Sequence, residues 1–410
     1  MNILFVINAL DVGGAETFLM RLMKELYSQK HRTFIYILEP TLNNASFEKT
    51  FFNETKAILV KGPKQHKIFQ SFLFYKINAL LLRFGHEDYY KKHLRRRTSR
   101  YFKRLLKDKY HIEIINSHLH SSDIFASEFL KPLLNIPHII TMQGCYESVI
   151  SLNDKDATER ATAAILNCDG LTYVAEKNLN FLNLTNTPVP YINKKIYNGL
   201  SEPDKNTSKN RKDYNISEND FVIGQVSRSI ESKGMEIAAK AVEYLIEEKD
   251  CKNLKLIIVG PENDYYKELK SKYSIKNYIL FPGSTNNAIE WITLFDIGIL
   301  PTYFPSESCP SSIIEYLACG KPVISTYIGE IPRMIEVGDK KAGTLVHFDK
   351  DNGKPLVMEI ADSIMTYFND KALYKEHSGL AKEAFSKFEI KKIAENYLDI
   401  YKNVLTKSQK

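Results

Sequence analysis

Residues 297–325 read IGILPTYFPSESCPSSIIEYLACGKPVIS, a stretch that contains a strand, a loop, a helix and the start of a second strand. Ile297–Leu300 is a short apolar run typical of a buried strand. Pro310 suits the first helical position, and Gly320 is typical of a helix end. Val323–Ser325 opens the next apolar run. Two strands joined by a crossover helix predict a parallel sheet.

The same alternation extends over the whole chain. Further strands are predicted at Ile3–Ile7, Thr33–Leu38, Ile112–Asn116, His138–Met142, Lys195–Tyr197, Phe221–Val226, Leu256–Val259 and Tyr278–Phe281. A helix follows the first strand, with one apolar face formed by Phe18, Leu19, Leu22, Met23 and Leu26. The predicted fold class is therefore α/β, with two Rossmann-like doubly wound parallel-sheet domains facing each other across a cleft.

A polar stretch from Ser201 to Asp220, SEPDKNTSKNRKDYNISEND, separates the two halves and predicts a linker or surface hairpin. We therefore expect an N-terminal domain over residues 1–200 and a C-terminal domain over residues 201–385. Residues 386–410 predict one amphipathic helix that packs back on the N-terminal domain. Its apolar side is formed by Ile390, Ile393, Tyr397, Ile400 and Tyr401.

Length and composition indicate a globular chain of more than one domain. Its 410 residues are 44% apolar and 26% charged, which is ordinary usage for proteins with packed cores. The five cysteines show no spacing typical of metal ligands. The N-terminus, MNILFVINALDVGGAE, lacks the basic segment of a signal peptide, and no apolar run is long enough to span a membrane. We expect a reduced, cytoplasmic setting.

Glu307 and Glu315 are the first candidate site residues. Glu307 lies in the loop before the predicted helix, and Glu315 lies in the second turn of that helix. Helical side chains lean toward the N-terminus, so Glu315 can point at a ligand bound there. The free N–H groups of that end suit a phosphate, and carboxylates suit sugar hydroxyls. Alternatively, Glu307 is solvated and Glu315 only complements the helix dipole.

Arg228 and Lys233 form a second candidate pair in the loop after the strand Phe221–Val226. Two cations at the end of a strand can hold a diphosphate and neutralise its charge as it leaves. The alternative is two exposed cations without a ligand. Gly13 and Gly14 follow the first strand and let the backbone approach a ligand, although a plain tight turn would look the same. GxGxxG is missing there, which argues against a dinucleotide site.

Taken in order, these motifs resemble the family-4 retaining glycosyltransferases (glycosyl transferases group 1) of GT-B architecture. The series is GGAE after the first strand, NG at Asn198-Gly199, SR…KG in the second half, E-x7-E before ACGKPVIS, then STYIGEIPRMI and a C-terminal helix. The resemblance spans nearly the whole chain. It implies transfer of a hexosyl or N-acetylhexosaminyl group from a nucleotide-diphosphate-sugar, with UDP the frequent nucleotide, to a glycan or lipid-linked acceptor. The implied setting is cell-surface polysaccharide or glycoconjugate synthesis.

The resemblance also implies roles for the matching residues. Arg228 and Lys233 would hold the donor diphosphate, Glu315 the ribose hydroxyls and Glu307 the transferred sugar. The sugar and phosphates would lie against the backbone of Cys309, Pro310, Ser311 and Ser312, with Gly13 and Gly14 near the diphosphate and the acceptor.

No metal and no other cofactor is implied, because Arg and Lys replace a divalent ion. The Asp-x-Asp at Asp154–Asp156 lies in the wrong domain for a metal–diphosphate bridge and predicts a solvated helix start.

Four positions depart from the family pattern or carry an open role. Gln143 stands where many relatives have a histidine facing the anomeric carbon, and a glutamine can hydrogen-bond a sugar but cannot exchange a proton. Retention through front-side attack, with the leaving phosphate as base, needs no protein base. His118 and His120 resemble a His-x-His of relatives and would line the acceptor side of the cleft, or lie at the surface or cap a helix. Pro310 replaces a glycine common at that position.

The segment 64–110 combines an apolar run at 68–84 with a basic run at 91–109 that has ten Lys or Arg and one Asp. Apolar residues beside clustered cations predict docking on an anionic membrane surface, and therefore a lipid-linked acceptor and a peripheral position on the inner face of the membrane. The alternative is a solvated helix face. A nucleic-acid partner is not indicated, because no motif for one accompanies the basic run.

Two other functions remain open at this point. A nucleotide-sugar epimerase could share the architecture, but it does not account for the SR…KG and E-x7-E series. A non-catalytic nucleotide-sugar- or membrane-binding protein could keep the fold, and Gln143 leaves that alternative open.

Overall fold

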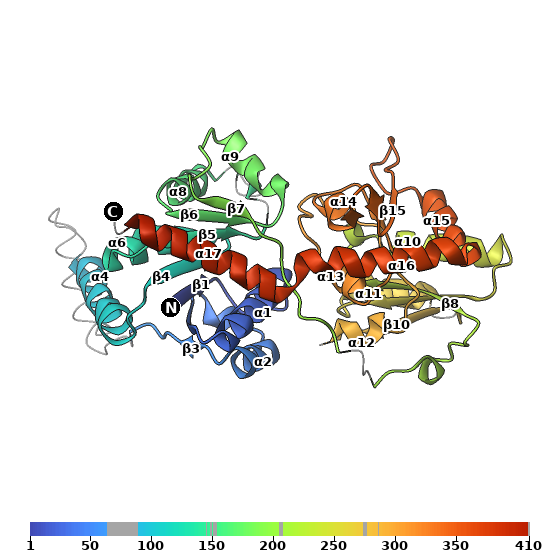
Figure 1. Ribbon diagram of the computed structural model, residues 1–410, viewed down its shortest axis with the longest axis horizontal. Helices are drawn as coiled ribbons and strands as arrows, with labels where there is room; N and C mark the ends of the chain where they lie inside the picture. Colours follow the sequence, from blue (N-terminus) through green and yellow to red (C-terminus); the bar gives the residue numbers. More distant parts are fainter. Residues whose placement is uncertain are drawn as a thin grey trace.

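The computed structural model describes residues 1–63, 89–144, 146–147, 150, 154–204, 208–273, 277–285 and 287–408, with the backbone alone for 89–95. The predicted apolar helix at 68–84 lies outside these residues. Two parallel sheets, each flanked by helices, lie next to each other along the long axis of the molecule (Figure 1). The predicted fold class is confirmed.

The first sheet has seven parallel strands in the order β3-β2-β1-β4-β5-β6-β7. Their bounds are Ile58–Leu59 (β3), Arg32–Ile37 (β2), Asn2–Ile7 (β1), Ile114–His118 (β4), His138–Met142 (β5), Gly170–Tyr173 (β6) and Asn193–Lys195 (β7). In β1, Leu4 pairs with Phe34 on one side and Ile115 on the other. A central parallel strand is covered on both faces, which is why β1 is an unbroken apolar run.

Helices cover both faces of this sheet. They are α1 (Gly14–Ser28), α2 (Ala45–Thr55), α4 (Tyr89–Phe102), the π-helical segment η3 (Lys103–Lys109), α5 (His120–Phe125), α6 (Lys131–Leu134), α8 (Lys155–Leu166) and α9 (Asn180–Leu184). The five apolar residues predicted on α1 are all buried. Asp154 caps α8 by accepting a hydrogen bond from the backbone N–H of Ala157 at 2.9 Å, so the prediction of a helix start there is confirmed.

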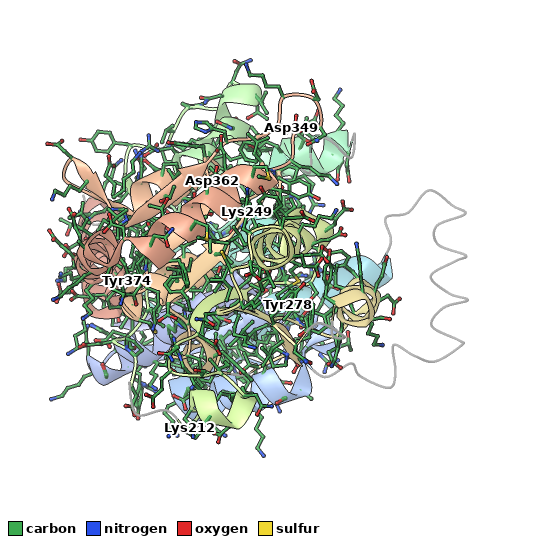
Figure 2. The ribbon with its side chains drawn as sticks, turned by 90° about the vertical axis from the view of Figure 1, so that its right-hand side faces the viewer. Lys212, Lys249, Tyr278, Asp349, Asp362 and Tyr374 are labelled. Carbon is green, nitrogen blue, oxygen red and sulfur yellow. The ribbon has the colours of Figure 1, made fainter. Side chains whose placement is uncertain are left out.

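The second sheet has six parallel strands in the order β10-β9-β8-β11-β12-β15. Their bounds are Ile279–Gly283 (β10), Leu254–Val259 (β9), Phe221–Val226 (β8), Ile297–Leu300 (β11), Val323–Thr326 (β12) and Gly343–Val346 (β15). The helices around it are α10 (Met235–Glu247), α11 (Asp264–Tyr273), α12 (Ala288–Ile292), α13 (Ser311–Ala318), α14 (Ile331–Met334), α15 (Val357–Asn369) and α16 (Lys371–Phe385). Figure 2 views the molecule from the distal end of this domain.

The observed strands differ from the predicted ones mainly at the sheet edges. The bounds of β5, β8 and β11 match the prediction, whereas β3, β6 and β15 were not predicted. The last strand of the first half was predicted at Lys195–Tyr197, and it lies two residues earlier, because β7 pairs with β6 over Asn193–Lys195. Edge and short strands carry few apolar residues, so they give no clear hydrophobic pattern. The polar stretch 201–220 contains one turn of 3₁₀ helix, Arg211–Tyr214.

Both sheets reverse their strand order beside the first strand. In the first sheet the chain moves outward from β1 to β3 and then returns to β4, next to β1. In the second sheet the chain moves outward from β8 to β10 and then returns to β11, next to β8. Ligands of such sheets bind beyond the carboxyl ends of the strands at these points. The loops after β1, β8 and β11 carry Gly13–Gly14, Arg228 with Lys233, and Glu307, respectively.

The C-terminal helix α17 (Ile390–Ser408) runs from the second domain back along the first (Figure 1). The apolar residues predicted on α17 are all buried in a cluster shared with β1 and α1, which confirms that face. Tyr401 is fully buried and donates a hydrogen bond of 2.7 Å to Oδ1 of Asn116 in β4. The chain passes between the domains near Leu200 and again near Glu389, and these two segments are hydrogen-bonded to each other in a parallel β-bridge.

We predict that Tyr401→Phe lowers the free energy of unfolding of the N-terminal domain by about 1–3 kcal/mol, because a buried Asn116 oxygen loses its hydrogen bond. Urea unfolding followed by circular dichroism measures the change. Tyr191→Phe is the control: Tyr191 is 89% exposed, so its change should stay within about 0.5 kcal/mol. Equal stability of wild type and Tyr401→Phe would contradict the prediction.

Candidate active site

A cleft of about 720 Å³ opens where the strand-to-helix loops of the two domains meet. Its N-terminal wall comes from the loops after β1 and β5, and its C-terminal wall comes from the loops after β8 and β11 and the start of α13. Most of the predicted site residues line it: Gly13, Gly14, Gln143, Arg228, Lys233, Cys309, Pro310, Ser311, Ser312 and Glu315. Glu307, His118 and His120 do not line it.

The two cations of the C-terminal wall are held in place by their neighbours. Lys233 Nζ forms an ion pair with Glu307 Oε2, which also accepts a hydrogen bond of 2.9 Å from Thr302. The centre of the Phe304 ring lies 5.3 Å from Arg228 Cζ and 5.1 Å from Lys233 Nζ, so both cations lie within cation–π distance of one aromatic ring. Burial lowers the pKa of Lys233, and Glu307 opposes that shift.

Glu307 therefore lies behind Lys233 rather than on the surface of the cleft. Its side chain is 7% exposed, and both contacts described above are made by its Oε2. A buried carboxylate needs a cation or hydrogen-bond donors, and the loop after β8 supplies Lys233. The sequence placed Glu307 in the correct loop but did not indicate this pairing.

Local backbone geometry explains why Lys233 is buried. Residues Glu231–Lys233 form a 3₁₀ turn, and the next residue, Gly234, has φ +74°. A Cβ on Gly234 would lie 2.2 Å from the carbonyl oxygen of Pro301, so only glycine fits between the loops after β8 and β11. The backbone carbonyl of Lys233 accepts a hydrogen bond of 2.8 Å from Gln225.

The helix α13 begins at Ser311. Pro310 is its N-cap, whereas the sequence predicted Pro310 as the first helical residue. Its start faces the start of α1: a Cβ on Gly14 would lie 3.5 Å from Ser311 Oγ. Two helix N-termini therefore point into one cleft, and both favour negative charge. Cys309 is buried, which raises the pKa of its thiol to about 12 and keeps it neutral.

Glu315 makes a contact between the domains that the sequence did not indicate. Its Oε1 pairs with Arg21 of α1 at 2.9 Å, and the two side chains are 11% and 19% exposed. Arg21 is 294 residues away along the chain, so no local pattern announces the pair. Glu315 still lines the cleft beside the start of α13, as its place in the second turn predicts.

The two histidines differ from the expectation for the acceptor side. His118 is fully buried at the end of β4, with its ring 5.9 Å from that of Phe5, and burial lowers its pKa to about 3. The ring of His120 at the start of α5 packs edge-on against Tyr146. Leu119, which lies between them, lines the cleft instead. The chain turns sharply here, because β4 ends at His118, Leu119 has φ +73° and α5 begins at His120, and this turn leaves neither histidine among the residues that line the cleft.

Sequence reasoning missed several further residues of the cleft as site residues, among them Asp11, Glu16, Asn198 and Phe304. Glu16 and Asn198 belong to the motifs GGAE and NG, which gave a signal for the loop but not for the side chain. Phe304 lies between a strand and a candidate carboxylate and carries no chemical signature. Among the described residues, no group of three His, Cys, Asp or Glu side chains could hold a metal ion.

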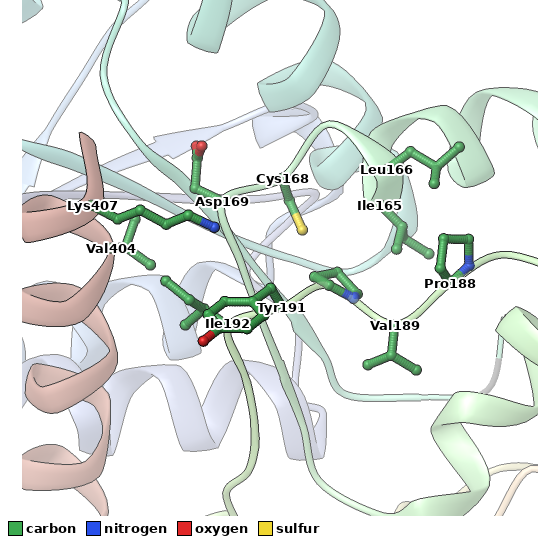
Figure 3. A pocket seen from close by; sticks show the side chains of 11 residues that line it. Ile165, Leu166, Cys168, Asp169, Pro188, Val189, Tyr191, Ile192, Val404 and Lys407 are labelled. Carbon is green, nitrogen blue, oxygen red and sulfur yellow. The ribbon is translucent and has the colours of Figure 1, made fainter. Parts of the chain in front are cut away.

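A second cavity, of about 460 Å³, lies on the N-terminal domain away from the cleft (Figure 3). It is bordered by α8, the segment before β7 and the end of α17. Asp169 is paired with Lys131 at 2.8 Å, and burial raises the pKa of the Cys168 thiol to about 12. Lys407 Nζ lies 4.8 Å from the centre of the Tyr191 ring. Its polar groups are thus engaged or unreactive, and they form no catalytic arrangement.

Comparison with known proteins agrees with this geometry. A crystal structure of HepE from Anabaena in complex with UDP has a TM-score of 0.74 and 18% identity, covering 97% of this chain and 99% of HepE. The fold is that of the GT-B glycosyltransferases. Residues 206–383 match the family model for glycosyl transferases group 1.

Curated relatives match over shorter stretches. An N-acetyl-alpha-D-glucosaminyl L-malate synthase of Bacillus anthracis is 28% identical over 51% of this chain and 53% of its own length. A putative colanic acid biosynthesis glycosyltransferase, WcaL of Escherichia coli, is 24% identical over 38% of this chain and 44% of its own length. The chain thus spans about half the length of these two relatives.

Proposed function

We propose that the protein is a retaining glycosyltransferase that moves a sugar from a nucleotide-diphosphate-sugar to an acceptor hydroxyl. The observation that carries the proposal is the convergence of Arg228, Lys233 and the start of α13 on one cleft. Two fixed cations and free N–H groups at a helix start complement a diphosphate. The match of residues 206–383 to glycosyl transferases group 1 and the GT-B fold of the chain support the same reaction class.

The positions of the site residues support this donor class. Arg228 and Lys233 bind the diphosphate, the backbone from Cys309 to Ser312 lies along the phosphates and sugar, and Glu315 accepts hydrogen bonds from ribose hydroxyls. Gly13 and Gly14 leave room for the diphosphate and the acceptor. Glu307 orients Lys233 and faces the transferred sugar once the diphosphate draws the ammonium away.

UDP is the proposed nucleotide, and the sugar is a hexosyl or N-acetylhexosaminyl group. Solved structures of HepE hold UDP and UDP-glucose, which supports this choice. The name of the Bacillus anthracis relative refers to an N-acetylglucosaminyl group.

In the proposed chemistry, catalysis depends mainly on stabilisation of the leaving group. The bond from the anomeric carbon to the diphosphate oxygen breaks, and the diphosphate keeps the electron pair. The acceptor oxygen attacks from the same face, and its proton passes to the departing phosphate. Arg228, Lys233 and the start of α13 stabilise the charge that develops there, so we propose that no metal ion is required. Gln143 positions hydroxyls and exchanges no proton.

We predict that Lys233→Ala lowers the rate of UDP release by at least about a hundredfold, with the nucleotide sugar that the wild type turns over as substrate. The charge that develops on the departing diphosphate loses the hydrogen-bond donor that Lys233 supplies. A coupled UDP assay over a panel of nucleotide sugars measures the rate. Lys240→Ala changes an exposed lysine on α10 and should keep the wild-type rate.

Thermal unfolding of the Lys233→Ala variant shows whether its fold persists. A folded variant with the wild-type rate would contradict the proposed role of Lys233. Tight binding of a nucleotide sugar without turnover in the wild type would favour a non-catalytic binding protein.

We further propose that the acceptor is a glycan or a lipid-linked glycan in cell-surface polysaccharide synthesis, and that the protein works at the cytoplasmic face of a membrane. In α4 and η3, Arg96, Arg100, Lys103 and Arg104 are exposed while Phe102 is buried. We call these four cations the basic face. It lies at the end of the N-terminal domain that points away from the C-terminal domain (Figure 1).

The alternative interpretation of this segment, a solvated helix face, also has support. The apolar side of the described part packs in the core through Phe102 and Leu106. Docking would therefore depend on charge within the described residues. None of the described helices has the length and apolar character needed to cross a bilayer.

We predict that the double variant Arg100→Gln, Lys103→Gln binds phosphatidylserine-containing vesicles at least about tenfold more weakly than the wild type, because each cation near an anionic surface contributes about 1 kcal/mol. Vesicle flotation measures the binding. The matched control is Lys212→Gln, Lys249→Gln at the distal end of the C-terminal domain (Figure 2). Equal recovery of the wild type with neutral and anionic vesicles would remove the membrane proposal.

A further inference from the structure

The two walls of the cleft differ in charge. On the C-terminal wall the lining cations are Arg228 and Lys233, and the lining carboxylate of Glu315 is paired with Arg21. On the N-terminal wall, the ionisable side chains among the described lining residues are two carboxylates, Asp11 and Glu16. The cationic wall faces a donor diphosphate in the proposed function. The acidic wall is left to face the acceptor.

Glu16 occupies a position set by the fold. It lies in the first turn of α1, directly after Gly13 and Gly14. A Cβ on Gly13 would lie 2.2 Å from the Glu16 carboxylate oxygen Oε2, so the glycine leaves room for the carboxylate to lie over the loop. Burial and the nearby Asp11 raise the pKa of Glu16, while Arg228 opposes this shift from across the cleft.

Two polar side chains of the same cleft have atoms without a partner among the described residues. Asn198 is 5% exposed, and its Oδ1 accepts no hydrogen bond from the described residues. Nε2 of Gln143 is also buried and donates none within the described part of the chain. Both residues line the cleft. An unpaired buried polar atom costs free energy, which a ligand that meets it would recover.

These groups complement hydroxyls. A hydroxyl can donate to the Glu16 carboxylate or to Asn198 Oδ1 and can accept from Gln143 Nε2. A carboxylate or phosphate on the acceptor would instead face Asp11 and Glu16, and like charges within one site reduce affinity.

We infer that the acceptor presents neutral hydroxyls to this wall, as a glycan or other polyol does, and that Glu16 accepts a hydrogen bond from one of them. The inference rests on the proposed function and narrows its acceptor class. Any anionic part of a lipid-linked acceptor would then lie outside the cleft, and the exposed cations of the basic face are available to it at the far end of the domain.

The experiment compares two probes that differ by a single carboxylate, methyl α-D-glucoside and methyl α-D-glucuronoside. Saturation-transfer NMR in the presence of UDP measures their binding to the full chain. The wild type should bind the glucoside at least tenfold more tightly. Glu16→Lys should erase or reverse that preference, because the wall gains a cation. Glu48→Lys, in the first turn of α2 and outside the cleft, should keep it.

Tighter or equal binding of the glucuronoside by the wild type would overturn the inference, and so would undetectable binding of the glucoside. A wild-type preference in Glu16→Lys would overturn the role of Glu16. Thermal unfolding of that variant shows whether it is folded. The NMR measurement does not depend on turnover, so failure of UDP release in the earlier assay would contradict the proposed function separately.

Discussion

The architecture of the site depends on one buried cation. Lys233 is 6% exposed, and a lysine ammonium persists in such a place only with a charged partner. Glu307 supplies the carboxylate and Phe304 supplies an aromatic face. Gly234 makes the arrangement possible, because its positive φ lets the loop after β8 pass against the carbonyl of Pro301. The loops after β8 and β11 are therefore joined at the point where a leaving group would be stabilised.

Contacts between the domains complete the site by fixing its second wall. Arg21 of α1 pairs with Glu315 of α13, and Asn178 donates a hydrogen bond of 3.2 Å to Ser308 beside Glu307. Glu330, 1% exposed, accepts hydrogen bonds from Lys195 at 2.7 Å and Tyr197 at 2.9 Å across the same boundary. These partly or fully buried polar contacts require close approach of the domains. They bring the starts of α1 and α13 together, so that the N-terminal and C-terminal walls face each other across one cleft.

Sequence reasoning recovers what a local pattern encodes. Apolar runs located the central strands, and the loops after β1, β8 and β11 were identified because motifs follow those strands directly. Asp154 was correctly read as a helix start. Contacts between distant segments leave no such pattern, so the Arg21–Glu315 pair and the burial of Glu307 behind Lys233 were not predicted. His118 and His120 were misplaced because a motif does not say which side of the chain faces the cleft.

In the proposed function the two substrates have different surroundings: the cations and the start of α13 would bind the diphosphate, and the carboxylates and amides would bind the acceptor hydroxyls. The proposed function depends on the position of the diphosphate, and a crystal structure with UDP tests that position most directly. We predict both phosphates within hydrogen-bonding distance of Arg228, Lys233 and the backbone N–H groups at Ser311 and Ser312. A diphosphate bound elsewhere, with the Lys233–Glu307 pair and the start of α13 untouched, would contradict this prediction.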